Sequence, residues 1–362
     1  MEASHLHDVC MAGDVAPVSV WPATTDEQED RWAEVLDCLA GTVPPGRVSV
    51  VVDGAEGRTR LLADRLAATV RGTGRPCVRL AEDAPATADG WSAEHTAQTV
   101  AIADGAHWRA APPGGRCDLL VWLRPSPGDD LSRGDHGHDA DVVVDLQDPN
   151  WPVIRHLAPH LAGHDRWYVA ENRAFFAARA ATWDTKFGDN MPAYAAAVVE
   201  ADLPYGGVVV DVGCGTGRAL PALREAVGSE GSVIGLDLTP QMLAVAKSYG
   251  RARQAALVLA DARRLPLPDG AADAVFAAGL LMHLPSTETG LAELARVTRS
   301  GGRLVLFHPS GRAALAARHG RTLRPDDALA EGPLRRSMAV VGWELETYDD
   351  PPERFFAVAS RR

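Results

Sequence analysis

The sequence predicts an α/β protein with two domains, each built on a sheet of mostly parallel strands. A length of 362 residues is long for one domain and ordinary for two. From about Arg47, short apolar runs alternate with stretches of helical spacing, as expected for buried parallel strands and their connecting helices. A stretch with three prolines at 148–168 interrupts this alternation. We therefore divide the chain into an N-terminal extension (1–44), a first domain (45–165) and a second domain (166–362).

The first domain begins with an apolar strand at 47–53, which leads into a stretch of helical spacing at 58–72 that stops at a glycine. A polar, glycine-rich loop is expected at 126–140. Further strands are expected at 76–82, 99–105, 117–125 and 141–147.

The second domain opens with a helical stretch at 167–200. Two β-like pieces, at 343–350 and 354–361, are joined at "DPPE" and close the chain. Between the helical stretch and this closing pair, strands are expected at 207–213, 231–237, 255–261, 272–279 and 302–308.

The composition favours a cytoplasmic protein that acts on small molecules. A formal net charge of −12 without a basic stripe argues against nucleic acid as a partner. No apolar run approaches the roughly 20 residues that span a bilayer, and the N-terminus lacks the basic and apolar regions of a signal peptide. Neither a disulfide framework nor a metal site is expected. The cysteines are scattered, at Cys10, Cys38, Cys77, Cys117 and Cys214.

A glycine loop follows the first strand of the second domain, in "VVVDVGCGTG" at 208–217. Such a loop brings the backbone close to a nucleotide, although its spacing differs from the G-x-G-x-x-G of dinucleotide folds. Asp237 ends the next strand, where a carboxylate can accept both ribose hydroxyls. Asp261 ends the third strand, where it can accept an adenine amine, and small residues up to Gly279 end the fourth. Open α/β sheets bind their ligands at this carboxyl edge.

Several motifs in this order resemble those of the class I S-adenosylmethionine-dependent methyltransferases. "VVVDVGCGTG" is similar to the glycine loop of that family, and "GLDLTPQMLAVA" to its ribose-binding strand end and the helix that follows. "LADARRLPLPDGAADAVFAAGLLMHL" resembles its adenine and fourth-strand segments, and "ARVTRSGGRLVLFHP" its fifth strand. The C-terminal "WELETYDDPPERFFAVASRR" resembles the antiparallel pair that ends the fold. The resemblance covers 168–362 and implies a Rossmann-like, seven-stranded sheet with an antiparallel last strand.

The resemblance implies S-adenosylmethionine as the cofactor. Its amino-acid part would meet the backbone of the glycine loop, its ribose would meet Asp237, and its adenine would meet Asp261. A methionine at helical spacing, such as Met242, also fits plain core packing. The predicted cofactor residues are Asp211, Gly213, Cys214, Gly215, Gly217, Asp237, Leu238, Met242, Asp261, Ala262 and Gly279.

A methyl acceptor that must lose a proton needs a base. His283, just after the fourth strand, is the first candidate because the usual pKa of histidine suits that role. A second interpretation is that His283 makes only a supporting hydrogen bond. His308, which leaves the fifth strand, is the other candidate and is assigned to the acceptor pocket.

The segment at 175–198 resembles the lid helices that cover small-molecule methyltransferase sites. Its aromatic residues either line an apolar acceptor pocket or pack the lid onto the sheet. They are Phe176, Trp183, Phe187 and Tyr194, of which Trp183 and Tyr194 are assigned to the pocket.

The first domain resembles the uridine-kinase-like nucleoside kinases, with "VVDGAEG" leading into a helix. A working phosphate loop requires G-x-x-x-x-G-K-[ST]. Aligned on Gly54, this chain has Thr59, Arg60 and Leu61 at the last three positions, and leucine cannot bind magnesium. We therefore predict a degenerate P-loop kinase-like domain without kinase activity. An unrelated α/β domain in which "DGAEG" is only a turn is the alternative.

Together these features predict a cytoplasmic methyltransferase that acts on a small molecule, in specialised metabolism. Two alternatives stay open: an enzyme that both phosphorylates and methylates, and a non-catalytic S-adenosylmethionine-binding sensor or scaffold. The first domain would line the acceptor pocket, bind a phosphorylated or nucleoside-like ligand without turning it over, or mediate dimerisation, and the sequence does not choose among these roles.

Overall fold

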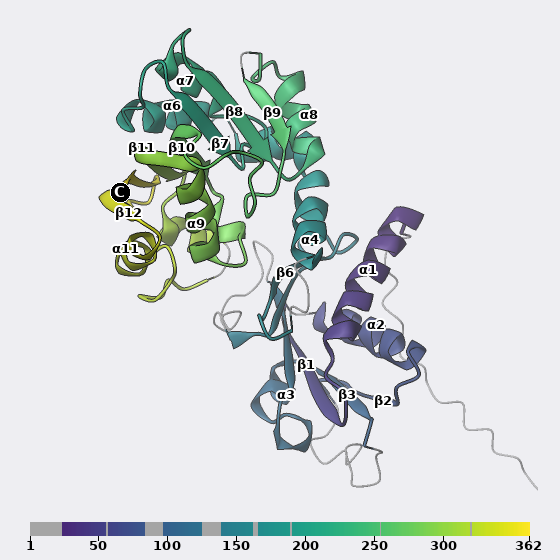
Figure 1. Cartoon of the computed structure of the whole chain (residues 1–362). Helices are drawn as coiled ribbons and strands as arrows, with labels where there is room; N and C mark the ends of the chain where they lie inside the picture. Colours follow the sequence, from purple (N-terminus) through teal and green to yellow (C-terminus); the bar gives the residue numbers. More distant parts are fainter. Residues whose placement is uncertain are drawn as a thin grey trace, which may run out of the picture.

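The chain forms two β-sheets, one in each half (Figure 1). The structure is a computed structural model. It describes residues 24–55, 57–83, 97–124, 139–161, 166–188, 190–253, 255–318 and 321–362. The loop predicted at 126–140 lies outside these residues except for its last two positions.

The N-terminal sheet has six strands in the order β2-β3-β1-β4-β5-β6. The first five are parallel, as the apolar runs predicted, and β6 pairs antiparallel with β5. We did not predict β6 as a separate strand, because prolines surround it. Pro152 directly precedes it, at a sheet edge where a missing N–H is tolerated. The strands are β1 (Val48–Gly54), β2 (Cys77–Leu80), β3 (Val100–Asp104), β4 (Leu119–Arg124), β5 (Val142–Asp145) and β6 (Val153–Leu157).

Two longer helices, α1 and α2, pack together on the N-terminal sheet (Figure 1). α1 begins at a capping box in which Thr25 and Gln28 satisfy each other's backbone N–H groups. Its apolar face, which includes Trp32 and Leu39, joins the same hydrophobic cluster as β1. This helix lies in the segment that we assigned to an extension, yet it is part of the folded unit. The helices are α1 (Asp26–Thr42), α2 (Thr59–Gly72), α3 (Ala106–Ala110) and the short η1 (Pro113–Gly115).

The C-terminal sheet has seven strands in the order β12-β13-β11-β10-β7-β8-β9. β13, the last strand in the chain, runs antiparallel to both of its neighbours, which confirms the predicted seven-stranded sheet. β7 to β11 are parallel, so their carboxyl ends meet at one edge. The strands are β7 (Val208–Val212), β8 (Ser232–Asp237), β9 (Ala256–Leu259), β10 (Ala272–Ala278), β11 (Thr298–His308), β12 (Trp343–Asp349) and β13 (Phe355–Arg361).

Helices cover both faces of the C-terminal sheet. Phe276, Phe307 and Phe356 fill the core on one face, and Trp343 and Leu291 belong to the cluster on the other. No helix within the described ranges is long and apolar enough to cross a membrane. The helices are α4 (Arg166–Ala177), η4 (Ala180–Thr182), α5 (Trp183–Phe187), α6 (Met191–Glu200), α7 (Leu220–Val227), α8 (Pro240–Ser248), η5 (Leu281–His283), α9 (Thr287–Val297), α10 (Arg312–Arg318) and α11 (Glu331–Val340).

The helical stretch predicted at 167–200 is divided among α4, η4, α5 and α6 (Figure 1). α4 is anchored on the N-terminal sheet through Glu171. The Glu171 carboxylate accepts hydrogen bonds from the backbone N–H of Ile154, at 2.6 Å, and from the guanidinium of Arg31. Arg31 also donates through Nε to the carbonyl of Pro152 at 2.8 Å. α4 is thus bonded to α1 and β6. We call α4, α5 and α6, which cover the lid helices predicted at 166–200, the lid.

We expect Leu39→Ala to lower the free energy of unfolding by about 2–5 kcal/mol, because Leu39 is 0% exposed and its removal leaves a cavity. The exposed Asp37, in the same helix, is the matched control, and Asp37→Ala should change stability by no more than about 0.5 kcal/mol. Urea denaturation followed by tryptophan fluorescence measures both. Equal effects of the two substitutions would show that α1 is only an appendage.

Candidate cofactor and acceptor site

The carboxyl edge of the C-terminal sheet gathers the acidic residues that the sequence singled out. Asp211 lies near the end of β7, Asp237 ends β8 and Asp261 follows β9. β7 lies between β8 and β10, and Gly279 directly follows β10. The predicted cofactor residues therefore come from adjacent strand ends.

Asp237 fixes the shape of the glycine loop. Its Oδ2 accepts a hydrogen bond from the N–H of Gly215 at 2.9 Å, and its Oδ1 accepts one from the N–H of Thr239 at 2.8 Å. Burial raises the pKa of Asp237 above its usual value, although the hydrogen bonds from these N–H groups act in the opposite direction. Each oxygen keeps a second lone pair, so the carboxylate can hold the loop and still accept ribose hydroxyls.

Two loop glycines serve different needs. Gly215 has φ +54°, and a Cβ atom added there would meet nothing within 4 Å, so the backbone is open to a ligand. Gly217 has φ +79°, and a Cβ would lie 3.0–3.1 Å from Leu220 and Ala246. Gly215 therefore suits the approach of a cofactor, whereas Gly217 allows close packing of α7 and α8.

Asp211 carries a buried carboxyl group that lacks a partner among the described residues. The residue is 1% exposed, and neither carboxyl oxygen has a hydrogen-bond partner. Burial, with a smaller contribution from Asp237, raises the pKa of Asp211 to about 8. Buried polar groups normally have partners. An unpaired acceptor beside the glycine loop fits the ammonium group of the amino-acid tail of S-adenosylmethionine.

The other predicted cofactor residues differ in exposure. Met242 is 1% exposed in α8, which leaves little side-chain surface for a ligand and agrees with its alternative role in the core. Cys214 and Ala262 are also buried. The carbonyl of Leu238 accepts a hydrogen bond from Arg173 Nε of α4 at 3.0 Å, so the lid is bonded to the segment after β8.

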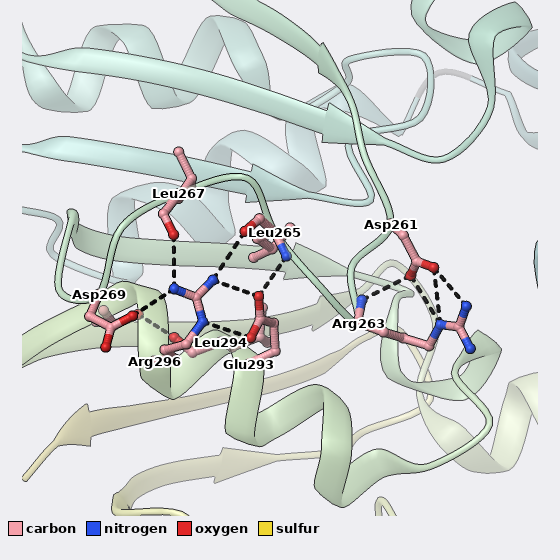
Figure 2. Close-up of polar contacts among 9 residues, drawn as sticks. Asp261, Arg263, Leu265, Leu267, Asp269, Glu293, Leu294 and Arg296 are labelled. Carbon is pink, nitrogen blue, oxygen red and sulfur yellow. Dashed lines mark hydrogen bonds and ion pairs between the residues drawn. The ribbon is translucent and has the colours of Figure 1, made fainter. Parts of the chain in front are cut away.

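Asp261 is already engaged by Arg263 (Figure 2). The carboxylate accepts hydrogen bonds from the N–H of Arg263 at 2.9 Å and from its guanidinium at 2.7–3.1 Å. The guanidinium also lies over the ring of Tyr168, with 4.4 Å between Cζ and the centroid. An adenine amine would have to share Asp261 with Arg263 or displace it. The sequence contained both residues but gave no sign of this competition.

Arg296 fastens the segment that follows Asp261 (Figure 2). Its guanidinium donates to the carbonyls of Leu265 and Leu267 at 3.0 and 2.8 Å. It also pairs with Glu293 and Asp269, each at 2.7 Å. Because Arg296 belongs to α9, this helix holds the loop between β9 and β10 in place.

His283 is not arranged as a base in this structure. Its Nδ1 lies 2.7 Å from a guanidinium nitrogen of Arg155, which can only donate, so Nδ1 accepts and the neutral ring carries its proton on Nε2. The geometry agrees with the supporting hydrogen bond that was the alternative interpretation.

His308 has the opposite arrangement. Its Nδ1 donates to the carbonyl of Ser310 at 2.9 Å, so the lone pair of the neutral ring lies on Nε2. Burial lowers the pKa of His308, which keeps the ring neutral and able to accept a proton. Gly279, Leu280 and Phe307 line a hollow together with His308. Of the two predicted histidines, His308 is the one whose hydrogen bonds suit a base.

The lid is held to the glycine loop by Asp184 of α5, which the sequence did not single out. Its carboxylate accepts hydrogen bonds from Thr216 Oγ1 at 3.0 Å, Arg218 Nε at 2.7 Å and Arg251 at 2.6 Å. Burial acts to raise the pKa of Asp184, but these hydrogen bonds outweigh it and the pKa lies below its usual value. Arg218 directly follows the glycine loop and is 5% exposed, which no local pattern revealed.

The lid aromatics divide between the two predicted roles. Phe176 lies between Trp183 and His283, with ring centroids 5.6 and 5.1 Å away. Tyr194 instead packs on Phe307, with 5.0 Å between centroids. The side chain of Phe187 lies outside the described residues.

Comparisons with known proteins identify the C-terminal half. Residues 210–306 match a family model described as "Methyltransferase domain". The chain is 36% identical over 110 residues to a demethylmenaquinone methyltransferase of Bacillus licheniformis, and the aligned segment covers 30% of this chain and 47% of that protein. It is 35% identical over 126 residues to the O-methyltransferase cnsE of Penicillium expansum, which covers 32% and 45%.

The C-terminal half contains a class I S-adenosylmethionine-dependent methyltransferase domain. A solved S-adenosylmethionine-dependent methyltransferase from Aquifex aeolicus is 21% identical, with a TM-score of 0.42, and covers 50% of this chain and 98% of that one. The chain spans about half the length of the curated relatives it matches. S-adenosylmethionine is the cofactor of this methyltransferase domain.

The segment that matches the family model lies outside the N-terminal half, so the kinase-like character of that half stays a prediction. The loop after β1 leads directly into α2, which begins at Thr59. Thr59 is buried, and Leu61 packs against the hydrophobic core. No group of three or more potential metal ligands occurs in the part of the chain that the structure describes.

For the methyltransferase domain we expect Asp211→Asn to flatten the dependence of stability on pH. The pKa of Asp211 is about 8 when folded and 3.8 in its ordinary state, so the folded protein binds more protons between these values. Its contribution to stability is therefore present below about pH 4 and is lost as the pH rises towards 8. Urea midpoints at pH 5, 7 and 9 measure this loss.

The exposed Asp326 provides the control, because Asp326→Asn should leave the pH dependence of the wild type intact. If Asp211→Asn loses as much stability between pH 5 and 9 as the wild type, Asp211 is not the group that titrates.

Proposed function

We propose that this protein transfers a methyl group from S-adenosylmethionine to a small-molecule acceptor. The observation that carries the proposal is Asp237, which holds the glycine loop while keeping lone pairs for ribose hydroxyls. The open backbone at Gly215 and the unpaired carboxyl group of Asp211 complete a cradle for the amino-acid tail. These three features lie on adjacent strand ends within the segment that matches the family model.

Bound S-adenosylmethionine supplies an electrophilic methyl group, so the chain need only position the acceptor and remove its proton. Holding the two reactants in line contributes about 7–11 kcal/mol to catalysis in well-oriented systems. The lid, fastened by Asp184 and Arg173, would exclude water from the acceptor. We assign proton removal to His308 Nε2, and we assign a positioning role to His283.

The acceptor class rests on the relatives. They include a demethylmenaquinone methyltransferase and an O-methyltransferase, whose names refer to small molecules or oxygen acceptors. We infer an acceptor of similar size, modified in specialised metabolism in the cytoplasm. The N-terminal domain would support this site without phosphorylating a substrate, because Leu61 supplies no hydroxyl for magnesium.

Calorimetric titration with S-adenosylmethionine tests the proposal. We expect saturable binding that Asp237→Ala weakens by at least about 30-fold, because two backbone N–H groups and the ribose lose their acceptor. Asp273→Ala is the matched control, since Asp273 accepts the N–H of Val208 at the opposite end of the sheet. Binding in this control should be unchanged. Absence of binding to the wild-type protein would refute the function.

The two histidines should separate in a kinetic comparison. With an acceptor that must lose a proton, His308→Gln should lower kcat by about 10²–10⁴-fold, because a positioned base is removed. It should also abolish the fall of kcat at low pH, which in the wild type follows protonation of His308 below its ordinary pKa of 6.5. His283→Gln should keep that fall. A larger loss of kcat in His283→Gln, with the low-pH limb removed, would reverse the assignment.

A further inference from the structure

Asp184 of the lid gathers three side chains around its carboxylate. Thr216 lies inside the glycine loop and Arg218 directly follows the loop, and both residues are buried. They donate to one oxygen of Asp184 at 3.0 and 2.7 Å, through Oγ1 and Nε. Arg251, which follows α8, donates to the other oxygen at 2.6 Å. One lid residue is therefore bonded to the glycine loop and to the segment after α8.

Arg251 extends this network to the backbone of the glycine loop. Its guanidinium donates to the carbonyl of Thr216 at 3.1 Å as well as to Asp184. The preceding residue, Gly215, donates its N–H to Asp237 at 2.9 Å. Two carboxylates therefore hold neighbouring residues of the loop, and one of them belongs to the sheet while the other belongs to the lid.

Asp184 also neutralises charge beside the loop. It is the carboxylate that pairs with both Arg218 and Arg251 among the residues that the structure describes. The Arg218 guanidinium is further bonded to Asn190, directly before α6. Without Asp184, two neighbouring guanidinium groups would lack a carboxylate, and a buried charge left unpaired is costly. The observed position of α5 is therefore favourable for the loop as well as for the lid.

The shape of the glycine loop matters because the loop meets the cofactor through its backbone. A loop that is already held in its binding shape loses less conformational freedom when the ligand arrives. The contacts of Asp184 exist only when α5 lies against the loop. They therefore favour the observed position of α5 and the binding shape of the loop together.

We propose that Asp184 is a positioning residue for S-adenosylmethionine, which holds Thr216 and Arg218 so that the glycine loop keeps the shape that receives the cofactor. Asp184 acts through these side chains and does not touch the cofactor itself. Because coupling is reciprocal, a bound cofactor also stabilises α5 in its observed position. The inference rests on the proposed function, because it assigns a further residue to the same cofactor site. It adds that the lid takes part in cofactor binding.

Calorimetry and hydrogen exchange on the full chain test this coupling, with S-adenosylhomocysteine as the probe. Asp184→Asn keeps the shape of the side chain but removes the charge that two arginines share. We expect it to raise the Kd of the probe by at least about fivefold. In the wild type, the probe should slow amide exchange in both the glycine loop and α5. In Asp184→Asn it should slow exchange in the loop but no longer in α5, whereas loss of a purely structural contact would leave this link intact.

Two further variants keep the test decisive. Glu200→Gln is the matched control, because Glu200 is another lid carboxylate whose partner, Arg354, lies between β12 and β13 instead of in the glycine loop. It should bind the probe like the wild type and keep the protection of α5. Arg251→Met removes the same network from the α8 side, should weaken the probe in the same direction, and replaces Asp184→Asn if that variant fails to fold.

The outcomes separate this inference from the proposed function. Wild-type binding of the probe, with affinity and protection of α5 unchanged in both network variants, overturns the inference alone. Failure of the wild type to bind S-adenosylhomocysteine refutes the proposed function and the inference together.

Discussion

The buried carboxylate of Glu171 is the contact on which the relation between the two halves depends. It belongs to the first lid helix, yet its partners, Arg31 and the N–H of Ile154, belong to the N-terminal half. A buried ion pair adds little net stability, but removing one partner typically costs about 3–5 kcal/mol because a charge is left unpaired. This ion pair therefore fixes how α4 lies against the N-terminal half and adds little to the free energy of unfolding. Ile154 is followed by Arg155, so the same contact places Arg155 beside the lid.

The lid is held by its neighbours at several points along α4 and α5. Glu171 of α4 holds it to the N-terminal sheet, and Asp184 of α5 holds it to the segment after the glycine loop. Arg173 adds a bond to the carbonyl of Leu238. The lid is thus coupled to the cofactor loop and to the N-terminal domain together.

Features that depend on strand order alone could be predicted from the sequence. Parallel strands with acids at their ends must bring those acids to one edge, so Asp211, Asp237 and Asp261 could be placed without knowing any distance. The antiparallel β13 was also predicted, because the closing pair of strands is a local pattern. α1 and β6 were missed, since one has its apolar face in a segment assigned to an extension and the other lies among prolines.

Side-chain partners could not be read from the sequence. Arg155 and His283 are 128 positions apart, and Asp184 meets Arg218 and Arg251 across 34 and 67 positions. No periodicity encodes such pairs, because they depend on how the lid settles between two sheets. The tautomer of each histidine depends on tertiary contacts of the same kind, which is why the sequence ranked His283 above His308.

The hydrogen bonds of the two histidines give the acceptor site a direction. His283 accepts from Arg155, whereas His308 donates to Ser310 and so presents a lone pair. An acceptor that meets His308 must therefore bring a protonated nucleophile to Nε2 of that ring, because Nε2 holds the lone pair.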